Sequence, residues 1–257
     1  MNKTINWDTY ELAFRCNICD TENKYGKIGY ARCRNALRCK SCDSSVRERA
    51  IVAAYKESES NVDELNKFIH ESSPRTNSLQ GLTRYFKKYS KYTPSNLLKG
   101  GKKQTLEHST IEVMNVDLQK MPFADNSVDL HLHSDVMEHV DSPGEAMTEM
   151  FRTLKPGGKA IFCCPILPIK QTKKVAYYDQ SGDIRSALPY RPWKIEYHGN
   201  PIDDNGSPVT HIFGADALRV LSFFEPAFEI KQTKHYSTSK GIVGNMTDVF
   251  VCVKPEE

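Results

Sequence analysis

The alternation of apolar and polar residues in the second half of the chain predicts strands that are joined by a helix. Residues 110–116 and 127–133 have the apolar pattern of strands, and residues 159–164 form a short run typical of a buried strand. Residues 143–154 place apolar side chains on one face of a helix, and Lys155-Pro-Gly-Gly158 ends it. Strand, helix and strand with short connections indicate a parallel sheet in an α/β domain.

Flanking segments extend this pattern in both directions. Residues 65–71 predict a first strand, and residues 44–57 predict a helix that precedes it. Near the end of the chain, residues 228–235 and 246–253 predict two strands joined by a turn at Lys240-Gly241. We expect these two strands to form an antiparallel pair at one edge of the sheet.

Residues 165–212 break the pattern. This segment carries six prolines, which regular helices and central strands do not accommodate. A loop-rich insertion of this length inside a compact domain usually has a function, such as a lid or a wall of a substrate site. A helix over residues 215–224 is expected to follow it.

The composition narrows the class of protein. The chain has 257 residues, of which 39% are hydrophobic and 26% are charged, which excludes a disordered chain. No apolar run approaches the roughly 18 residues of a spanning helix, so a membrane protein is not expected. The first residues lack the apolar core of a secretory signal, which predicts a cytoplasmic protein. A net charge of +3 does not by itself indicate a nucleic-acid partner.

Five of the eight cysteines fall within residues 16–42. Four of them form two C-x2-C pairs, and these four are Cys16, Cys19, Cys39 and Cys42. The spacing predicts a tetrahedral zinc site, and four thiolate ligands leave no open position, so the metal is structural. Reduced free thiols or a redox pair are the alternatives, and Cys33 is expected to be a spare thiol. We therefore expect a zinc-ribbon-like module at residues 1–50 and a main domain at residues 51–257.

The run from Phe123 to Val140, which ends in Ser134-Asp-Val-Met-Glu-His-Val140, resembles the class I S-adenosylmethionine-dependent methyltransferases, more narrowly their small-molecule type. The Lys155-Pro-Gly-Gly158 turn extends the likeness, and a preceding module with two C-x2-C pairs looks like a bacterial subgroup. The resemblance implies an α/β fold with a doubly wound seven-stranded, mostly parallel sheet and a terminal antiparallel strand. It also implies that S-adenosylmethionine lies over the C-terminal strand ends, as the general rule for open α/β sheets expects.

The resemblance also assigns cofactor contacts to particular residues. Asp117 and Leu118 match the position whose acidic side chain meets the adenine amino group. Ser134 and Asp135 match the turn after the fourth strand, near the methionine part of the cofactor. The glycine-rich first loop of the family is absent, and residues 68–75 occupy its place. The expected substitutes there are two small hydroxyl residues and an acid that binds the methionine amino group, namely Ser72, Ser73 and Glu71.

Three histidines are candidates to orient or deprotonate the acceptor, because imidazole titrates near neutrality. His139 matches the Glu-His pair of the family's turn. His198 lies in a polar cluster at residues 196–201, and His211 precedes the helix expected over residues 215–224. Packing, capping or a structural turn are the alternative roles for these side chains.

We expect a methyltransferase that moves a methyl group from S-adenosylmethionine to an oxygen or nitrogen of a small-molecule or sugar acceptor. The zinc module and the basic run 84–103, which has seven Lys and Arg residues and no acidic one, motivate an alternative in which the acceptor is RNA. The missing glycine loop motivates a third hypothesis, a degenerate fold that acts as a zinc-containing interaction protein. No membrane partner is expected, and the sequence leaves the acceptor and the oligomeric state open.

Overall fold

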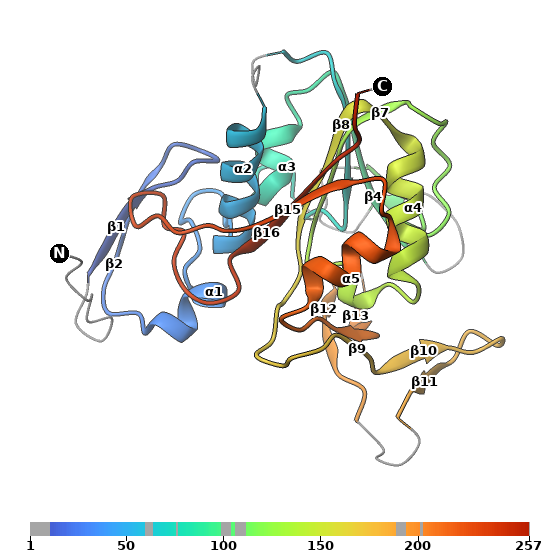
Figure 1. The fold of residues 1–257 in the computed structure, drawn as a ribbon. Helices are drawn as coiled ribbons and strands as arrows, with labels where there is room; N and C mark the ends of the chain where they lie inside the picture. Colours follow the sequence, from blue (N-terminus) through green and yellow to red (C-terminus); the bar gives the residue numbers. More distant parts are fainter. Residues whose placement is uncertain are drawn as a thin grey trace.

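One mixed sheet with the strand order β15-β16-β8-β7-β3-β4-β6-β5 organises the chain (Figure 1). The computed structural model describes residues 11–59, 64–75, 77–98, 104–105, 112–188, 194–200 and 203–256. The strands of the sheet, in the order of the chain, are β3 (Phe68–Ser72), β4 (Lys91–Asn96), β5 (Gln104–Thr105), β6 (Glu112–Asn115), β7 (Val128–Ser134), β8 (Leu154–Cys163), β15 (Glu229–Lys234) and β16 (Asp248–Val253).

The topology of this sheet confirms the predicted fold class. Strands β6, β4, β3, β7 and β8 are parallel to one another, whereas β16 runs antiparallel between β8 and β15. The two-residue strand β5 adds an eighth member, antiparallel to β6. From β3 the chain builds the sheet outward through β4 and β6, and then returns to the other side of β3 with β7 and β8. The C-terminal ends of β3 and β7 therefore flank the crevice in which open α/β sheets bind ligands.

Helices cover both faces of the sheet. Helices α2 (Val46–Ser58) and α3 (Gly81–Phe86) lie on one face, and α4 (Pro143–Thr153) and α5 (Ala217–Phe224) lie on the other (Figure 1). Each face has its own apolar core, which joins Ile51, Phe86 and Leu132 on the first face and Met147, Phe162 and Leu221 on the second. A sheet that is covered on both faces explains the continuous apolar run of strand β8.

Capping side chains stabilise the starts of two predicted helices. The Ser45 hydroxyl accepts a hydrogen bond from the Glu48 backbone N–H, and the Glu48 carboxylate accepts one from the Ser45 N–H in return. This capping box satisfies two N–H groups that the first turn of α2 leaves free. At the start of α4 the Ser142 hydroxyl accepts a hydrogen bond from the Glu145 N–H, and Pro143 takes the first helical position.

The Lys155-Pro-Gly-Gly158 segment differs from its prediction. We expected it to be a stop between the helix and a strand at residues 159–164, but β8 already begins at Leu154, directly after α4. Leu154 pairs with Val128, and the register shifts before Leu130 pairs with Lys159. The extra residues form an irregularity inside the strand pair, and Gly157 adopts a positive φ of 74° there.

The remaining elements are short. The N-terminal module contains a hairpin of β1 (Leu12–Arg15) and β2 (Glu22–Tyr25), a 3-10 turn (Tyr30–Arg32) and helix α1 (Cys33–Ala36). The proline-rich insertion contains β9 (Lys173–Lys174), β10 (Ala176–Tyr178), β11 (Ile184–Ser186), β12 (Tyr197–Asn200), β13 (Asp203–Pro208) and β14 (His211–Ile212). No helix within the described ranges combines the length and the apolar character that crossing a membrane requires.

Arg49 of α2 connects three distant segments. Its side chain is fully buried, and its guanidinium donates hydrogen bonds to the carbonyl groups of Ser44, of Leu37 at 2.9 Å and of Gly241 at 2.8 Å. The guanidinium carbon also lies 4.7 Å from the centre of the Phe14 ring. One cation thus satisfies carbonyl groups from the N-terminal module and from the turn that precedes β16.

An Arg49→Met substitution should lower the free energy of unfolding by about 3 kcal/mol or more, since each buried carbonyl that loses its donor costs about 1–3 kcal/mol. Denaturant unfolding monitored by circular dichroism measures this change. Arg219→Met is the matched control, because the Arg219 side chain is 78% exposed and its loss should shift stability by no more than about 0.5 kcal/mol. Equal unfolding midpoints for the two variants would contradict the role assigned to Arg49.

Candidate functional site

A cavity of about 440 Å³ opens beyond the C-terminal ends of β3 and β7. Its floor comes from the ends of these strands, one wall comes from the N-terminal module and the start of α2, and another comes from the insertion. The residues that line it are Arg34, Asn35, Arg38, Ser45, Arg47, Glu48, Glu71, Ser73, Arg75, Leu82, Ser134, Asp135, His139, His198 and Gly199. The cavity therefore occupies the point of the sheet at which α/β folds bind their ligands.

Ser73 occupies the loop after β3, where the resemblance implied glycines. Its φ is 56°, a left-handed conformation that a glycine adopts without strain. The Ser73 N–H donates to the Ser95 carbonyl at 2.8 Å, which ties the loop to the end of β4. Ser72, the last residue of β3, is buried and does not line the cavity.

Glu71 lines the cavity with a carboxyl group that is almost entirely buried. Burial raises the pKa of Glu71 to about 8, although the Tyr92 hydroxyl, which donates to the carboxylate at 2.6 Å, opposes that rise. A protonated carboxyl is a weak partner for an ammonium group, so a cation that bound here would also have to displace the Glu71 proton.

Asp135 follows β7 and is held by two arginines of the N-terminal part of the chain. Arg34 Nη2 donates to both carboxylate oxygens of Asp135, at 3.0 and 2.9 Å, and Arg47 Nε lies 2.9 Å from Oδ2. Asp135 has a φ of 56°, a conformation that aspartate tolerates better than most residues. The sequence pointed to Asp135 but not to the two arginines, although the basic loop between the cysteine pairs contains Arg34.

The turn after β7 brings two of the predicted histidines together. The His139 Nδ1–H donates to the Pro208 carbonyl at 2.9 Å, and burial lowers the pKa of His139. Its Nε2 lies 3.8 Å from Glu138 Oε1, and Nδ1 of His198 lies 4.0 Å from the same oxygen. The ring centres of the two histidines are 5.0 Å apart.

Three other predicted residues lie outside the lining of this cavity. His211 is buried, its Nδ1 is 3.0 Å from the Thr210 hydroxyl, and burial lowers its pKa to about 4. Asp117 follows β6 and accepts hydrogen bonds from the backbone and side-chain N–H groups of Gln119. Leu118 is buried in the core of the sheet face that α4 and α5 cover.

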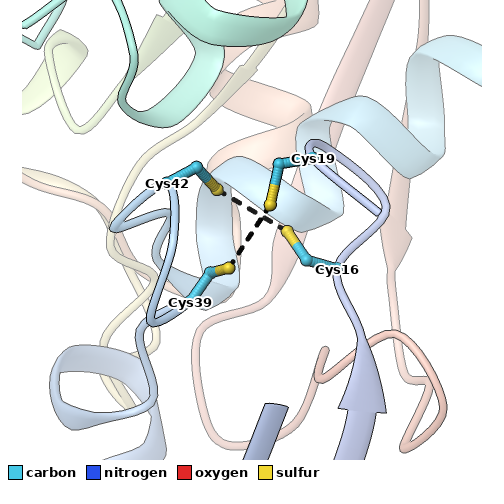
Figure 2. A group of neighbouring side chains, drawn as sticks. All are labelled: Cys16, Cys19, Cys39 and Cys42. Atoms are coloured by element: carbon cyan, nitrogen blue, oxygen red, sulfur yellow. Dashed lines mark hydrogen bonds between the residues drawn. The ribbon is translucent and has the colours of Figure 1, made fainter. Parts of the chain in front are cut away.

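The four cysteines of the two C-x2-C pairs meet in the N-terminal module (Figure 2). The Sγ atoms of Cys16 and Cys42 are 3.7 Å apart, and those of Cys19 and Cys39 are 3.5 Å apart. Four thiolates around a tetrahedral zinc ion, with bonds of about 2.3 Å, are roughly 3.8 Å from one another. The cluster therefore fits zinc in both its donor set and its size. Cys33 is buried outside the cluster, with its Sγ 3.7 Å from the Gly29 carbonyl.

The raised pKa of Glu71 predicts a pH-dependent difference between the wild-type protein and Glu71→Gln. An unfolded glutamate titrates near about 4.3, whereas the folded Glu71 titrates at about 8. Because the folded state binds the Glu71 proton more tightly than the unfolded state does, the protonated carboxyl contributes to the free energy of unfolding. This contribution is fully present below the pKa of the unfolded state and is lost as the pH rises to the pKa of the folded state. The free energy of unfolding of Glu71→Gln, measured relative to the wild type, should therefore be higher at pH 8.5 than at pH 5.

Denaturant unfolding at both pH values tests this prediction. Glu229→Gln is the control, because Glu229 is exposed. A difference between Glu71→Gln and the wild type that does not change with pH would refute the prediction.

Comparison with known proteins identifies the class of the central segment. Residues 78–162 match the family model of the methyltransferase domain. An uncharacterized methyltransferase of Mycobacterium tuberculosis strain H37Ra is 36% identical over 101 residues, which are 38% of this chain and 38% of that protein. One from Mycobacterium marinum is 35% identical over 101 residues, with the same coverage of 38% of each chain. The chain thus matches little more than a third of the length of these curated relatives.

Among solved structures, an S-adenosylmethionine-dependent methyltransferase from Mesorhizobium loti superimposes with a TM-score of 0.46 at 13% identity. The superposition covers 79% of this chain and 97% of that one. The domain match and the curated relatives together show that residues 78–162 are similar to a methyltransferase domain.

Proposed function

We propose that this protein transfers the methyl group of S-adenosylmethionine to an oxygen or nitrogen atom of a small acceptor that binds in the cavity beyond β3 and β7. The observation that carries the proposal is the position of this cavity. It lies where the strand order reverses, in a chain whose central segment matches the methyltransferase domain.

The residues proposed to hold the cofactor follow three strands along the same edge of the sheet. Glu71 lies near the end of β3 and Ser73 directly after it, whereas Ser134 ends β7 and Asp135 follows it. All four residues line the cavity. Asp117 follows β6, which lies two strands away from β3. We assign Asp117, with Leu118 beside it, to the adenine end of the cofactor and the β3 and β7 turns to its methionine end.

Methyl transfer does not require the protein to form a covalent intermediate, because the sulfonium of the cofactor supplies an activated methyl carbon. The protein has to orient the acceptor and accept its proton. His139 suits the second task, since its Nδ1–H is committed to the Pro208 carbonyl and its neutral Nε2 carries a lone pair. His198 lies beside it on the cavity wall, and His211 contacts Thr210, which anchors that wall.

The described part of the basic run 84–103 favours a small acceptor over RNA. Lys88 lies over the rings of Tyr85 and Tyr89, and Lys91 lies 3.8 Å from the centre of the Phe68 ring. The described basic residues of this run are absent from the cavity lining, whereas arginines of the N-terminal module line it. Lys99, Lys102 and Lys103 lie outside the described residues.

We further propose that the four-cysteine cluster binds a structural zinc ion. When bound, the ion would hold the two C-x2-C turns together and thereby fix the segment between them. That segment contains Arg34 and Arg38, which line the cavity. The metal then contributes to the methyltransferase site only indirectly, through the position of these arginines.

A pair of Ser73 variants tests cofactor binding. Calorimetric titration of the wild-type protein with S-adenosylhomocysteine should show saturable one-to-one binding. Ser73→Gly should bind at least as tightly, because glycine favours the positive φ found here. Ser73→Val should bind about tenfold more weakly or worse, because a β-branched residue in this conformation costs about 1–3 kcal/mol. Absence of wild-type binding at millimolar ligand would contradict the proposal and favour the degenerate-fold hypothesis.

A pair of cysteine variants tests the zinc site. Elemental analysis of the purified wild-type protein should give one zinc per chain. Cys16→Ser should lose this zinc and destabilise the N-terminal module, because metal binding and folding are coupled in such sites. Cys33→Ser, a matched change at a cysteine outside the cluster, should retain it. Equal zinc content in Cys16→Ser and wild type would disprove the four-cysteine assignment.

A further inference from the structure

Glu138 carries a buried carboxylate that makes no hydrogen bond to the described residues. The residue is 2% exposed and belongs to the short 3-10 turn Met137–His139 directly after β7. Neither of its carboxylate oxygens has a hydrogen-bond partner among the described residues. Burying such a group is costly unless a proton or a cation neutralises it. Burial and the neighbouring Asp135 accordingly raise the pKa of Glu138.

Two imidazole rings face this carboxylate. Glu138 Oε1, His139 Nε2 and a ring nitrogen of His198 form a group whose ligand atoms all lie within 4.8 Å of one another. His139 and His198 also line the cavity, so the group faces the space in which the acceptor is proposed to bind.

The surroundings pre-orient two of the three groups. The Pro208 carbonyl accepts the Nδ1 proton of His139, which leaves the Nε2 lone pair directed toward Glu138. A metal-binding histidine commonly donates its other N–H to a carbonyl group in this way. The insertion is tied to the same turn, because the Thr210 N–H donates to the Glu138 carbonyl at 2.8 Å and the Thr210 hydroxyl donates to the Val140 carbonyl at 2.7 Å.

We propose that Glu138, His139 and His198 bind a divalent transition-metal cation on the wall of the cavity. Two imidazole nitrogens and one carboxylate oxygen suit manganese, iron, cobalt or zinc, and three protein ligands leave coordination positions open. This site is separate from the four-cysteine cluster, which has no open position.

The spacing of the three groups is close to that of a metal site. Ligands at about 2.1 Å from a tetrahedral metal are roughly 3.4 Å apart, compared with 3.8 and 4.0 Å from Glu138 Oε1 to the two imidazole nitrogens. These two distances exceed that spacing by about 0.4 and 0.6 Å, and the three ligand atoms all lie within 4.8 Å of one another. His198 lies on an exposed hairpin strand and its side chain is 43% exposed, so it can make this adjustment.

The open coordination positions of the metal would allow the acceptor to bind to it directly. A hydroxyl oxygen of the acceptor that coordinates a divalent cation loses its proton more readily, here to solvent water, and the resulting alkoxide attacks the methyl carbon. With the metal bound, His139 serves as a ligand and no longer as the proton acceptor. This role rests on the proposed methyltransferase function, whereas metal binding itself does not. The two can therefore fail separately, and binding of the metal alone is the direct test.

The experiment uses the full chain with zinc already bound at the cysteines and Mn²⁺ as the probe. The electron paramagnetic resonance signal of free Mn²⁺ reports uptake, and Mn²⁺ prefers oxygen and nitrogen ligands over the thiolates of the other site. We expect one Mn²⁺ per chain in the wild-type protein, without cofactor or acceptor. Co²⁺ absorption provides a second probe, whose spectrum at this site should lack a thiolate charge-transfer band.

His198→Ala is the main test variant, since its exposed position makes a folding defect unexpected, and Glu138→Gln is the second. Both should weaken Mn²⁺ binding at least tenfold. Tyr197→Ala, at an exposed neighbouring position on β12, should leave it unchanged. The proposal would be overturned if the zinc-loaded wild-type protein took up neither Mn²⁺ nor Co²⁺. Unaltered Mn²⁺ affinity in His198→Ala would do the same.

Discussion

The contact of Asp135 with Arg34 and Arg47 joins the N-terminal module to the central crevice of the sheet. The carboxylate and both guanidinium groups are largely buried, with side-chain exposures of 18%, 16% and 14%. Removing one partner of such a pair leaves a poorly solvated charge behind, which costs more than the loss of an exposed ion pair. The wall of the cavity therefore depends on a contact between residues that are 101 positions apart in the chain.

This contact links the cysteine cluster to the site. Arg34 lies in α1, between the two C-x2-C pairs, and Arg47 lies in the first turn of α2. Arg49, in the same helix as Arg47, donates hydrogen bonds to the Leu37 carbonyl and to the Gly241 carbonyl. A structural metal in this module would thus act on the cavity through short, mostly buried contacts. The module and the sheet also share one apolar core, which runs from Leu12 through α2 to Val249.

The parts of the fold that the sequence predicted are those set by local pattern. The periodicity of β7 and α4 depends on a few neighbouring residues, and the structure confirms both elements. The start of β8 was misplaced because Lys155-Pro-Gly-Gly158 is typical of a stop, whereas pairing with β7 extends the strand through it.

The arrangement of the candidate site depends on contacts that no local pattern contains. Arg34, Arg47 and Glu138 were not among the predicted site residues. Arg34 and Arg47 both contact Asp135, which belongs to another part of the fold. Glu138 was noted only as a neighbour of His139. His211 and Asp117 were chosen from their positions along the chain, yet their side chains are engaged with Thr210 and Gln119 outside the cavity lining.

The insertion shows how a segment with little apolar cover can still hold a functional group in place. The residues of β12 are mostly exposed, so burial contributes little to the position of His198. Backbone hydrogen bonds set it instead, because the Val209 N–H donates to the Glu196 carbonyl and the Thr210 N–H donates to the Glu138 carbonyl, both at 2.8 Å. These bonds fix the base of the hairpin against the turn after β7. His198 therefore reaches the cavity from a hairpin that backbone hydrogen bonds, and not an apolar core, anchor beside Glu138.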